Sequence, residues 1–284
     1  MSESQPLDDI RLEHDKVVQV VKLLCEGMGI RATARIVNCH RDTVLGVLET
    51  VGQKCASLLD TKIRNIKAQF VQADEIHTFV GCKAQRTILT DMERGDFFTY
   101  LSVDRDSKLI INWRVSKRDS ENTLAFIQDL KGRMSGRFQF TTDSFRCYCD
   151  RNGAVRQTFN DSVDYATETK VFGRANLYTR LWRNPIVVIG IKRKARLGNP
   201  DMKMATTCHV ERTNLSVRTF TRRFTRCTLG FSKKQENLRH AVALFISHFD
   251  FVRKHGAHGQ TPAQAAGLTD HPWTVEELLQ QASL

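Results

Sequence analysis

The sequence predicts an α/β fold: a mixed five-stranded sheet flanked by helices, with an all-α segment in front of it. Up to about residue 70, apolar residues recur with the 3.6-residue period of helices; after it, runs rich in β-branched and aromatic residues alternate with helical stretches. At 284 residues and 41% hydrophobic content, the chain has room for one large domain and a small one. We therefore expect three segments, at 1–68, 69–255 and 256–284.

The N-terminal segment shows helical periodicity from its first apolar residues, with one stripe formed by Val17, Val20, Val21 and Leu24. The stretch that follows, GMGIRATARIVNCHRDTVLG, predicts a short helix over about 31–37 and a turn over 38–40. A longer helix is expected to start near Asp42 and to continue as a connector to about Phe70.

This helix, turn and helix have the spacing of a helix-turn-helix, whose second helix enters the major groove of DNA. His40, Arg41 and Thr43 are then the candidates for base contacts, and Arg31 and Arg35 for phosphate contacts. The alternative is a small helical bundle that caps the next domain.

The middle of the chain predicts the sheet. Three strand-like runs are followed by a helix with Ser120 as its N-cap, a short buried strand, a second helix and a last strand. These elements are expected at 71–82, 96–106, 108–119, 120–134, 137–143, 144–157 and 163–171. The order of three strands, helix, strand, helix and strand is that of an RNase H-like sheet.

The C-terminal third predicts helices. Amphipathic helical regions are expected over about 207–226 and 233–254. In the tail, Thr261 precedes a proline at the first helical position, and Thr274 with Glu277 forms a capping-box pattern. The tail should therefore form two short helices.

The charge of the chain favours a polyanionic partner. Its net charge is +12 and its pI is about 9.5, and positive side chains release counterions where they meet phosphates. Between Arg180 and Lys203 there are seven Lys or Arg residues and one acid. The stretch 191–203 is basic and irregular and is expected to be a loop, with Lys192, Arg193 and Lys194 on DNA. The alternative is that the charge serves solubility alone.

Three acids stand out by their positions. Asp74 lies on the first predicted strand, Asp143 ends the strand after the first helix, and Glu211 lies in the first turn of a late helix. In an RNase H-like sheet the first and fourth strands are neighbours, so these carboxylates are expected to meet. The ordinary alternative for each is a cap or turn residue. Glu75 should point to the opposite face of its strand and is the weaker candidate.

Three carboxylates in one place suit a hard cation with oxygen ligands, such as Mg²⁺. Two such ions about 4 Å apart activate an attacking hydroxyl or water and stabilise the leaving oxygen in phosphoryl transfer. Without metal, the carboxylates repel one another and raise one another's pKa.

The helix after Glu211 predicts phosphate contacts. At 100° per residue, Arg218 and Arg222 share the face of Glu211, while Arg212 and Arg223 lie to one side. Such arginines are placed to meet the phosphates that flank a scissile bond. A solvated basic helix face is the competing interpretation.

Two classes of protein are disfavoured: zinc-finger proteins, and membrane or secreted proteins. Eight cysteines occur without any C-x-x-C pair, so no zinc finger is expected. No run approaches 18 apolar residues, and the acidic N-terminus lacks the order of a secretory signal. We therefore expect a cytoplasmic, nucleoid-associated protein.

The run HVERTNLSVRTFTRRFTRCTLGFSKKQENLRHAVALFISHFDFVRKH (209–255) resembles the C-terminal half of insertion-sequence-one-type transposases. The resemblance extends to QADEIHTFVG (72–81), FQFTTDSFRCY (138–148) and TPAQAAGLTDHPWTVEELL (261–279), and covers most of the chain from about residue 15. It implies a DDE-type transposase of RNase H-like fold, dependent on two Mg²⁺ or Mn²⁺ ions.

The same resemblance places the family's acidic residues on Asp74, Asp143 and Glu211. Asp250 stands where the family usually has Asn, and we expect His248 and Asp250 to lie near the active site, without an assigned role. Ser144 stands where Gly often follows the second Asp. These differences leave the three acids in place.

The sequence therefore predicts a transposase that cleaves element ends and transfers strands into target DNA. Its partners would be double-stranded DNA, both terminal inverted repeats and target, and further copies of itself in a homodimer or larger assembly. Two alternatives remain: a transposase-derived DNA-binding regulator without catalysis, and an RNase H-like nuclease that cleaves without joining.

Overall fold

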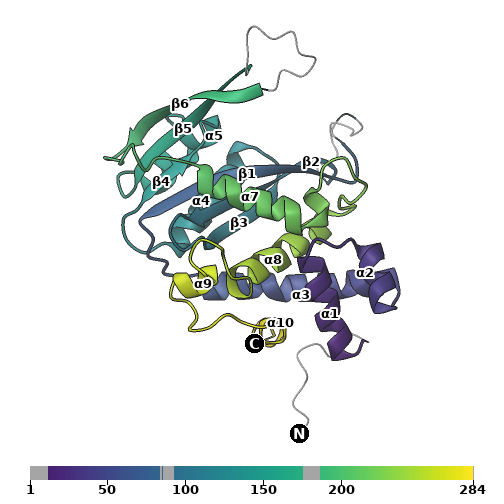
Figure 1. Cartoon of the computed structure of the whole chain (residues 1–284). Coiled ribbons are helices and arrows are strands. Elements are labelled where there is room, and N and C mark those ends of the chain that lie inside the picture. Colours follow the sequence, from purple (N-terminus) through teal and green to yellow (C-terminus); the bar gives the residue numbers. More distant parts are fainter. Residues whose placement is uncertain (1–11, 84, 86–92, 175–185, 284) are drawn as a thin grey trace.

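The computed structural model describes residues 12–83, 85, 93–174 and 186–283. The described strands form one mixed sheet in the order β3-β2-β1-β4-β5-β6 (Figure 1). Pairs β1–β2, β2–β3 and β5–β6 are antiparallel, while β4 is parallel to both β1 and β5. The strands span Phe70–Val80, Gly95–Asp104, Ile110–Ser116, Gln139–Thr142, Asp164–Arg174 and Ile186–Leu197.

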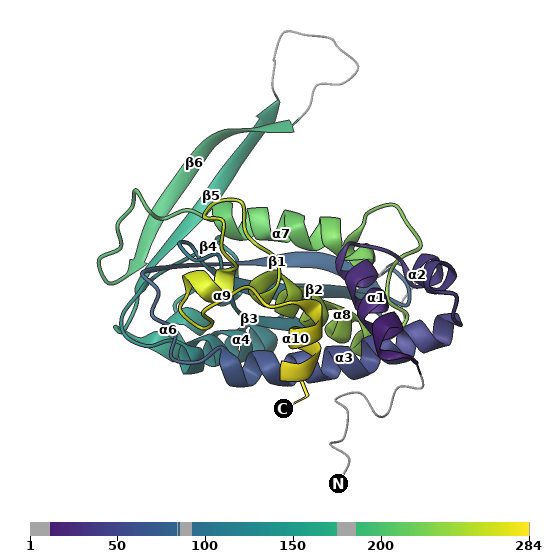
Figure 2. The ribbon, with the colours of Figure 1, turned by 60° about the horizontal axis from the view of Figure 1, so that its bottom comes forward.

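The first five strands confirm the RNase H-like order, and the sixth was not predicted. Strand β6 covers most of the stretch for which we expected a loop at 191–203, so that expectation is wrong. With its partner β5 it forms a two-stranded arm that extends beyond the rest of the sheet (Figure 2). Ile186 and Ile189 on the arm are 74% and 63% exposed. A strand without a buried face lacks the period-2 alternation by which strands are recognised.

Helices cover the two faces of the sheet. On β3, Asn112 donates from Nδ2 to the Phe126 carbonyl of α4 (Ser120–Arg133), which fixes α4 on one face. On β1, Gln72 accepts from the backbone N–H of Val210 in α7 (Cys208–Phe220), which fixes α7 on the other face (Figure 2). The cap of α4 is Asp119, whose side chain accepts from the Asn122 N–H; Ser120, the expected cap, is the first helical residue.

The N-terminal helices are α1 (His14–Cys25), α2 (Ile30–Val37) and α3 (Arg41–Lys62). The turn between α2 and α3 begins at Asn38, which has a left-handed φ of 54°. Helix α3 ends at Lys62 rather than near Phe70, and Asn65 soon after it has a φ of 55° that no helix accommodates. The connector is therefore shorter than predicted.

Helix α3 packs along α8 (Gln235–Phe251), so the N-terminal helices share a hydrophobic cluster with the C-terminal part. The helices approach closely at Gly52, where a Cβ would lie 2.5 Å from the Cβ of His240. The N-terminal segment thus rests on the body of the molecule, as the bundle interpretation expects, while the outer faces of α2 and of the start of α3 stay exposed.

Two predicted helices are shorter or divided. The one expected at 144–157 is split into α5 (Arg146–Cys149) and α6 (Ala154–Phe159). Gly153 lies between them, where a Cβ would come within 2.4 Å of the Tyr148 carbonyl oxygen. Helix α7 ends at Phe220 and is followed by the 3₁₀ turn η2 (Arg222–Phe224), so the helix expected to reach residue 226 stops one and a half turns early.

The tail confirms both start signals. Helix α9 (Pro262–Ala265) begins after a capping box made by Thr261 and Gln264, and α10 (Val275–Gln281) after the expected box of Thr274 and Glu277. Among the described residues, no helix is long and apolar enough to span a membrane. The expected absence of a secretory signal rested partly on residues 1–11, and the count of basic residues in the C-terminal part began at Arg180. These residues lie outside the described part of the chain.

Candidate active site

Asp74 and Asp143 are brought together by the pairing of the two central strands. Ala73 on β1 lies directly opposite Thr142, the last residue of β4, in a parallel ladder. Asp74 follows Ala73 on β1, and Asp143 follows the last residue of β4, so both carboxyl groups emerge at the same point of the sheet. Asp143 is held there by the Phe145 N–H, which donates to its Oδ1 at 2.9 Å.

A third carboxylate, Glu75, lies close to this pair. Asp74, Glu75 and Asp143 each offer one oxygen, and these oxygens lie within 4.8 Å of one another. Arg118 bridges two of them, with its Nη2 at 3.0 Å from Glu75 Oε2 and 3.6 Å from Asp143 Oδ2. Its guanidinium also lies over the ring of Phe145, 3.8 Å from the ring centroid.

Asp74 and Glu75 face opposite sides of the sheet, as strand geometry predicts. Asp74 contacts α7, because Asn214 Nδ2 donates to its Oδ2 at 2.8 Å. Glu75 instead contacts Arg118, which precedes α4, and its side chain is only 2% exposed. Asp143, at the end of β4, lies close to the carboxylates of both Asp74 and Glu75.

Burial weakens the acidity of these groups. It raises the pKa of Asp74 to about 6, and the negative charges of Asp143 and Glu211 add to this effect. Burial likewise raises the pKa of Glu75 to about 7. Two neighbouring carboxyl groups with raised pKa values are typical of sites that bind a cation or transfer protons.

Glu211 lies on α7 on the Asp74 side of the sheet. Its charge acts on Asp74, but its own carboxylate binds Lys170 on β5 and accepts from Thr207 Oγ1 at 2.8 Å. Glu211 therefore lies near the aspartates, but its two oxygens are already bound by Lys170 and Thr207.

The donor set fits a divalent cation. The carboxylates offer oxygen, the ligand that Mg²⁺ and Mn²⁺ prefer. Within the described part of the chain, Asn214 Oδ1 is buried without a hydrogen-bond partner beside Asp74. An orphaned buried oxygen is costly unless a donor or cation lies against it. Asp74, Glu75 and Asp143 present the oxygens that lie together, and Glu211 could join them only by releasing Lys170.

The arginines of the α7 region fall into two groups. Arg212 and Arg222 are exposed, and Arg218 lies near enough to Asp74 for their charges to interact. Arg222 does not share the helix face of Glu211, because α7 has ended at Phe220, so that expectation is wrong. Arg223 is turned inward and donates from Nε to Ser232 Oγ at 2.7 Å, and burial lowers its pKa to about 10.

The remaining predicted DNA contacts are mostly accessible. Lys192 and Lys194 are exposed on β6, whereas Arg193 points to the other face and pairs with the buried Glu168 at 3.0 Å. In the N-terminal helices Arg31, Arg35, His40 and Arg41 are exposed and Thr43 is partly exposed. His40 Nδ1 and Arg41 Nε lie 3.4 and 3.3 Å from the carboxylate of Asp42.

His248 and Asp250 are not part of this site. Both lie on α8, and Asp250 Oδ1 accepts from the backbone N–H of Ile110 on β3, two strands away from β1. Asp250 is fully buried and His248 is 8% exposed. The expectation that they lie near the carboxylates is therefore wrong, and their place is in the core.

Three residues of the site were missed from the sequence. Asn214 follows Glu211 by three residues, so helical spacing alone could have placed it one turn along the same face. Arg118 and Lys170 reach the carboxylates across 43 and 41 positions of the sequence. No local pattern signals such contacts.

Comparisons with known proteins add little to what the structure itself shows. No protein-family model matches the chain, and no curated protein matches it. One similar solved structure is the cryo-EM structure of the piggyBac transposase synaptic complex with hairpin DNA. The two share 9% identity with a TM-score of 0.39, over 96% of this chain and 70% of that one. A likeness this distant supports no functional inference.

Proposed function

We propose that the protein is a DDE-type DNA transposase, which cleaves DNA at element ends and joins the released 3′ ends to target DNA. The observation that carries the proposal is the ladder pair Ala73–Thr142, which places Asp74 and Asp143 side by side at the end of β4. Glu211 on α7 would complete the set. The resemblance of the sequence to insertion-sequence-one-type transposases supports the same three residues.

The chain's own residues would hold and orient the reacting groups. Two Mg²⁺ or Mn²⁺ ions would activate the attacking water or 3′-hydroxyl and stabilise the leaving oxygen. Asn214 fixes the orientation of Asp74 through its hydrogen bond, and Arg118 does the same for Asp143. Because Lys170 occupies the Glu211 carboxylate, Glu211 would bind a cation only after exchanging that partner.

DNA would be held on both sides of these carboxylates. Arg31, Arg35, His40, Arg41 and Thr43 would recognise the element ends through the helix-turn-helix. The arginines of the α7 region and the lysines of β6 would bind backbone phosphates. Since transposition handles two ends together, we infer that the protein acts as a homodimer or larger assembly on DNA.

Strand cleavage and joining on labelled DNA from the regions flanking the gene test this function. With Mg²⁺, Asp74→Asn, Asp143→Asn and Glu211→Gln should each lose at least about 10³-fold in rate, because several kcal/mol of transition-state stabilisation depends on each ligand. Asp161→Asn removes an exposed acid away from the site and is the matched control.

The outcomes separate the candidate functions. Cleavage and joining by the wild type, lost in all three variants that still bind DNA, supports the transposase. Tight DNA binding without cleavage in Mg²⁺ or Mn²⁺ would make the protein a DNA-binding regulator. Cleavage without joining would make it a nuclease.

A further inference from the structure

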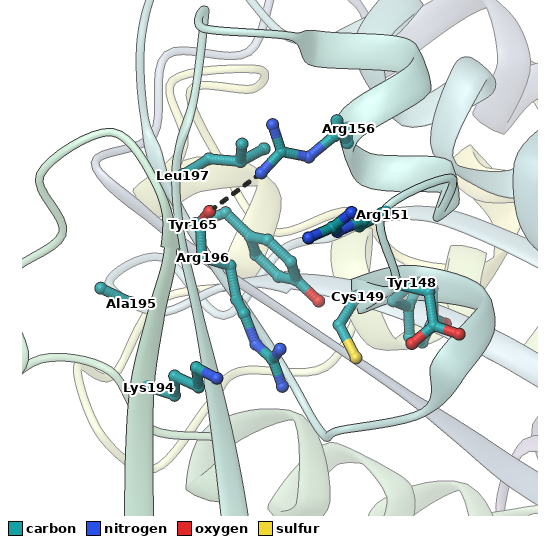
Figure 3. A pocket seen from close by; sticks show the side chains of 10 residues that line it. Tyr148, Cys149, Arg151, Arg156, Tyr165, Lys194, Ala195, Arg196 and Leu197 are labelled. Carbon is teal, nitrogen blue, oxygen red and sulfur yellow. Dashed lines mark hydrogen bonds between the residues drawn. The ribbon is translucent and has the colours of Figure 1, made fainter.

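A cationic pocket lies between the α5–α6 turn and the base of β6 (Figure 3). Its volume is about 360 Å³. Arg151 and Arg156 enter it from the helical side, and Lys194 and Arg196 from β6. These four side chains are called the cationic pocket below.

The positive charge of this pocket is not compensated by any carboxylate in the described part of the chain. Within the described residues, none of the four cations takes part in a salt bridge. Arg156 donates to the carbonyl of Arg196 at 3.4 Å, and Arg196 Nε donates to Thr167 Oγ1 at 3.1 Å, so both bind neutral oxygens. The one acid in the lining, Asp150, is 59% exposed and lies 4.0 Å from Arg146 outside the pocket. Four cations gathered around a hollow repel one another unless an anion lies between them.

Two residues of the pocket lining contact the sequence neighbours of Asp143. Tyr165, in its lining, places its hydroxyl 2.7 Å from Thr142 Oγ1, and Thr142 precedes Asp143. Cys149, also in the lining, donates from Sγ to the carbonyl of Ser144 at 3.7 Å, and Ser144 follows Asp143. These contacts lie on the face of the sheet opposite α7, where Glu75 and Arg118 also lie. A strand with one phosphate at Asp143 therefore reaches the cationic pocket around the end of β4.

We propose that the cationic pocket binds a backbone phosphate of the DNA strand that leads away from the cleavage site, an inference that rests on the proposed function. Guanidinium groups bind phosphate oxygens through two parallel hydrogen bonds, which explains the use of three arginines. The hollow lies at the small end of ligand pockets and admits one phosphodiester group rather than a duplex. Lys194 belongs to this subsite, whereas Arg193 on the opposite face is occupied by Glu168.

Binding of a labelled duplex from the flanking DNA, without metal and at several salt concentrations, tests this inference. The pocket variant is Arg151→Gln with Arg156→Gln, and the control is Lys62→Gln with Lys67→Gln, which removes two exposed positive charges elsewhere. The pocket variant should bind about tenfold more weakly. The slope of its log affinity against log salt concentration should become shallower by about the amount that one phosphate contact contributes. Lys194→Gln provides a second, independent pocket variant, and thermal unfolding verifies that each variant folds.

A series of duplexes, each with one neutral methylphosphonate linkage, identifies the phosphate. At one position the neutral linkage should weaken binding by the wild type and the control but have no further effect on the pocket variants. If no position behaves in this way, or if pocket and control variants lose the same affinity, the inference is overturned. If inorganic phosphate binds the pocket while DNA affinity is unchanged in the variants, the site takes a free anion and the DNA assignment fails. Because binding is measured without cleavage, an inactive wild type that shows the coupling would refute only the proposed function.

Discussion

Asn214 donates a hydrogen bond from Nδ2 to Oδ2 of Asp74 at 2.8 Å, joining helix α7 to the central strand β1. The bond favours the ionised form of a carboxyl group whose burial raises its pKa to about 6. It also holds α7, which is distant in sequence, in a fixed position over β1. Asn214 is thus a positioning residue for the first carboxylate.

Asn214→Ala should move the acid limb of the pH profile of strand cleavage upward by about one unit. The ionised Asp74 loses a donor, so its pKa rises and the carboxylate is available only at higher pH. The measurement is the cleavage rate between pH 5 and 9. Thr219→Ala, exposed on the same helix, is the control. A uniform loss of rate at every pH would show that Asn214 acts only through packing.

Glu75→Gln should keep cleavage within about tenfold of the wild type, whereas Asp74→Asn should lose at least about 10³-fold. Glu75 points to the other face of β1, its pKa is raised to about 7, and Gln can still accept from Arg118. The two rates, measured with saturating Mg²⁺, decide whether Glu211 or Glu75 binds the metal together with Asp74 and Asp143. Equal loss in both variants would make Glu75, rather than Glu211, the third ligand.

The part of the site that could be predicted from the sequence is the part that strand order determines. Once β1 and β4 are neighbours and parallel, Asp74 and Asp143 have to meet, because each follows a paired residue. The helix starts at Thr261 and Thr274 could be predicted because their signals are local: four successive residues contain a whole capping box.

What could not be predicted depends on contacts across the fold. The helical periodicity after Glu211 continues through Arg222 in the sequence, but the backbone leaves the helix at Thr221, which has a φ of −123°. Strand β6 has no buried face to produce alternation, since its partner β5 leaves the body with it. The binding of Glu211 by Lys170 joins two elements that no local pattern relates.

His248 should make the folded state less stable as the pH falls from 6.5 toward 4. Burial lowers its pKa from 6.5 to about 4, so in this window the unfolded chain binds a proton that the folded chain does not. Above pH 6.5 His248 is neutral in both states and the free energy of unfolding keeps its full value. By pH 5 the free energy of unfolding has fallen by about 2 kcal/mol. Urea unfolding at pH 7.5 and 5 measures the change, and His248→Gln should remove this part of it.

The control for His248 is the exposed His271, whose pKa is raised by its hydrogen bond to Asp270. Its contribution has the opposite sign, because it binds a proton more readily when folded, and stabilisation is therefore lost as the pH rises. His271→Gln should not flatten the loss of stability in acid. If it flattens that loss as much as His248→Gln, the buried histidine is not its source.

Asp250→Asn should increase the stability of the folded protein at neutral pH. Burial raises the pKa of Asp250 well above its usual value, so the folded chain keeps a proton that the unfolded chain has already released. Stability is therefore greatest below the unfolded pKa near 4 and falls as the pH rises toward the folded pKa, by up to about 1.4 kcal/mol per unit. Asn has the same shape, still accepts from the Ile110 N–H, and cannot ionise.

The advantage of Asp250→Asn should be small at pH 4 and grow at pH 6 and 8, as measured by urea unfolding at each pH. Asp161→Asn, an exposed substitution of the same kind, should show no such growth. Because Asp250 bonds to β3 and not to the carboxylates, cleavage by the variant should stay within about twofold of the wild type. An advantage that does not change with pH would mean that Asp250 is ionised in the folded core, with a cation beside it.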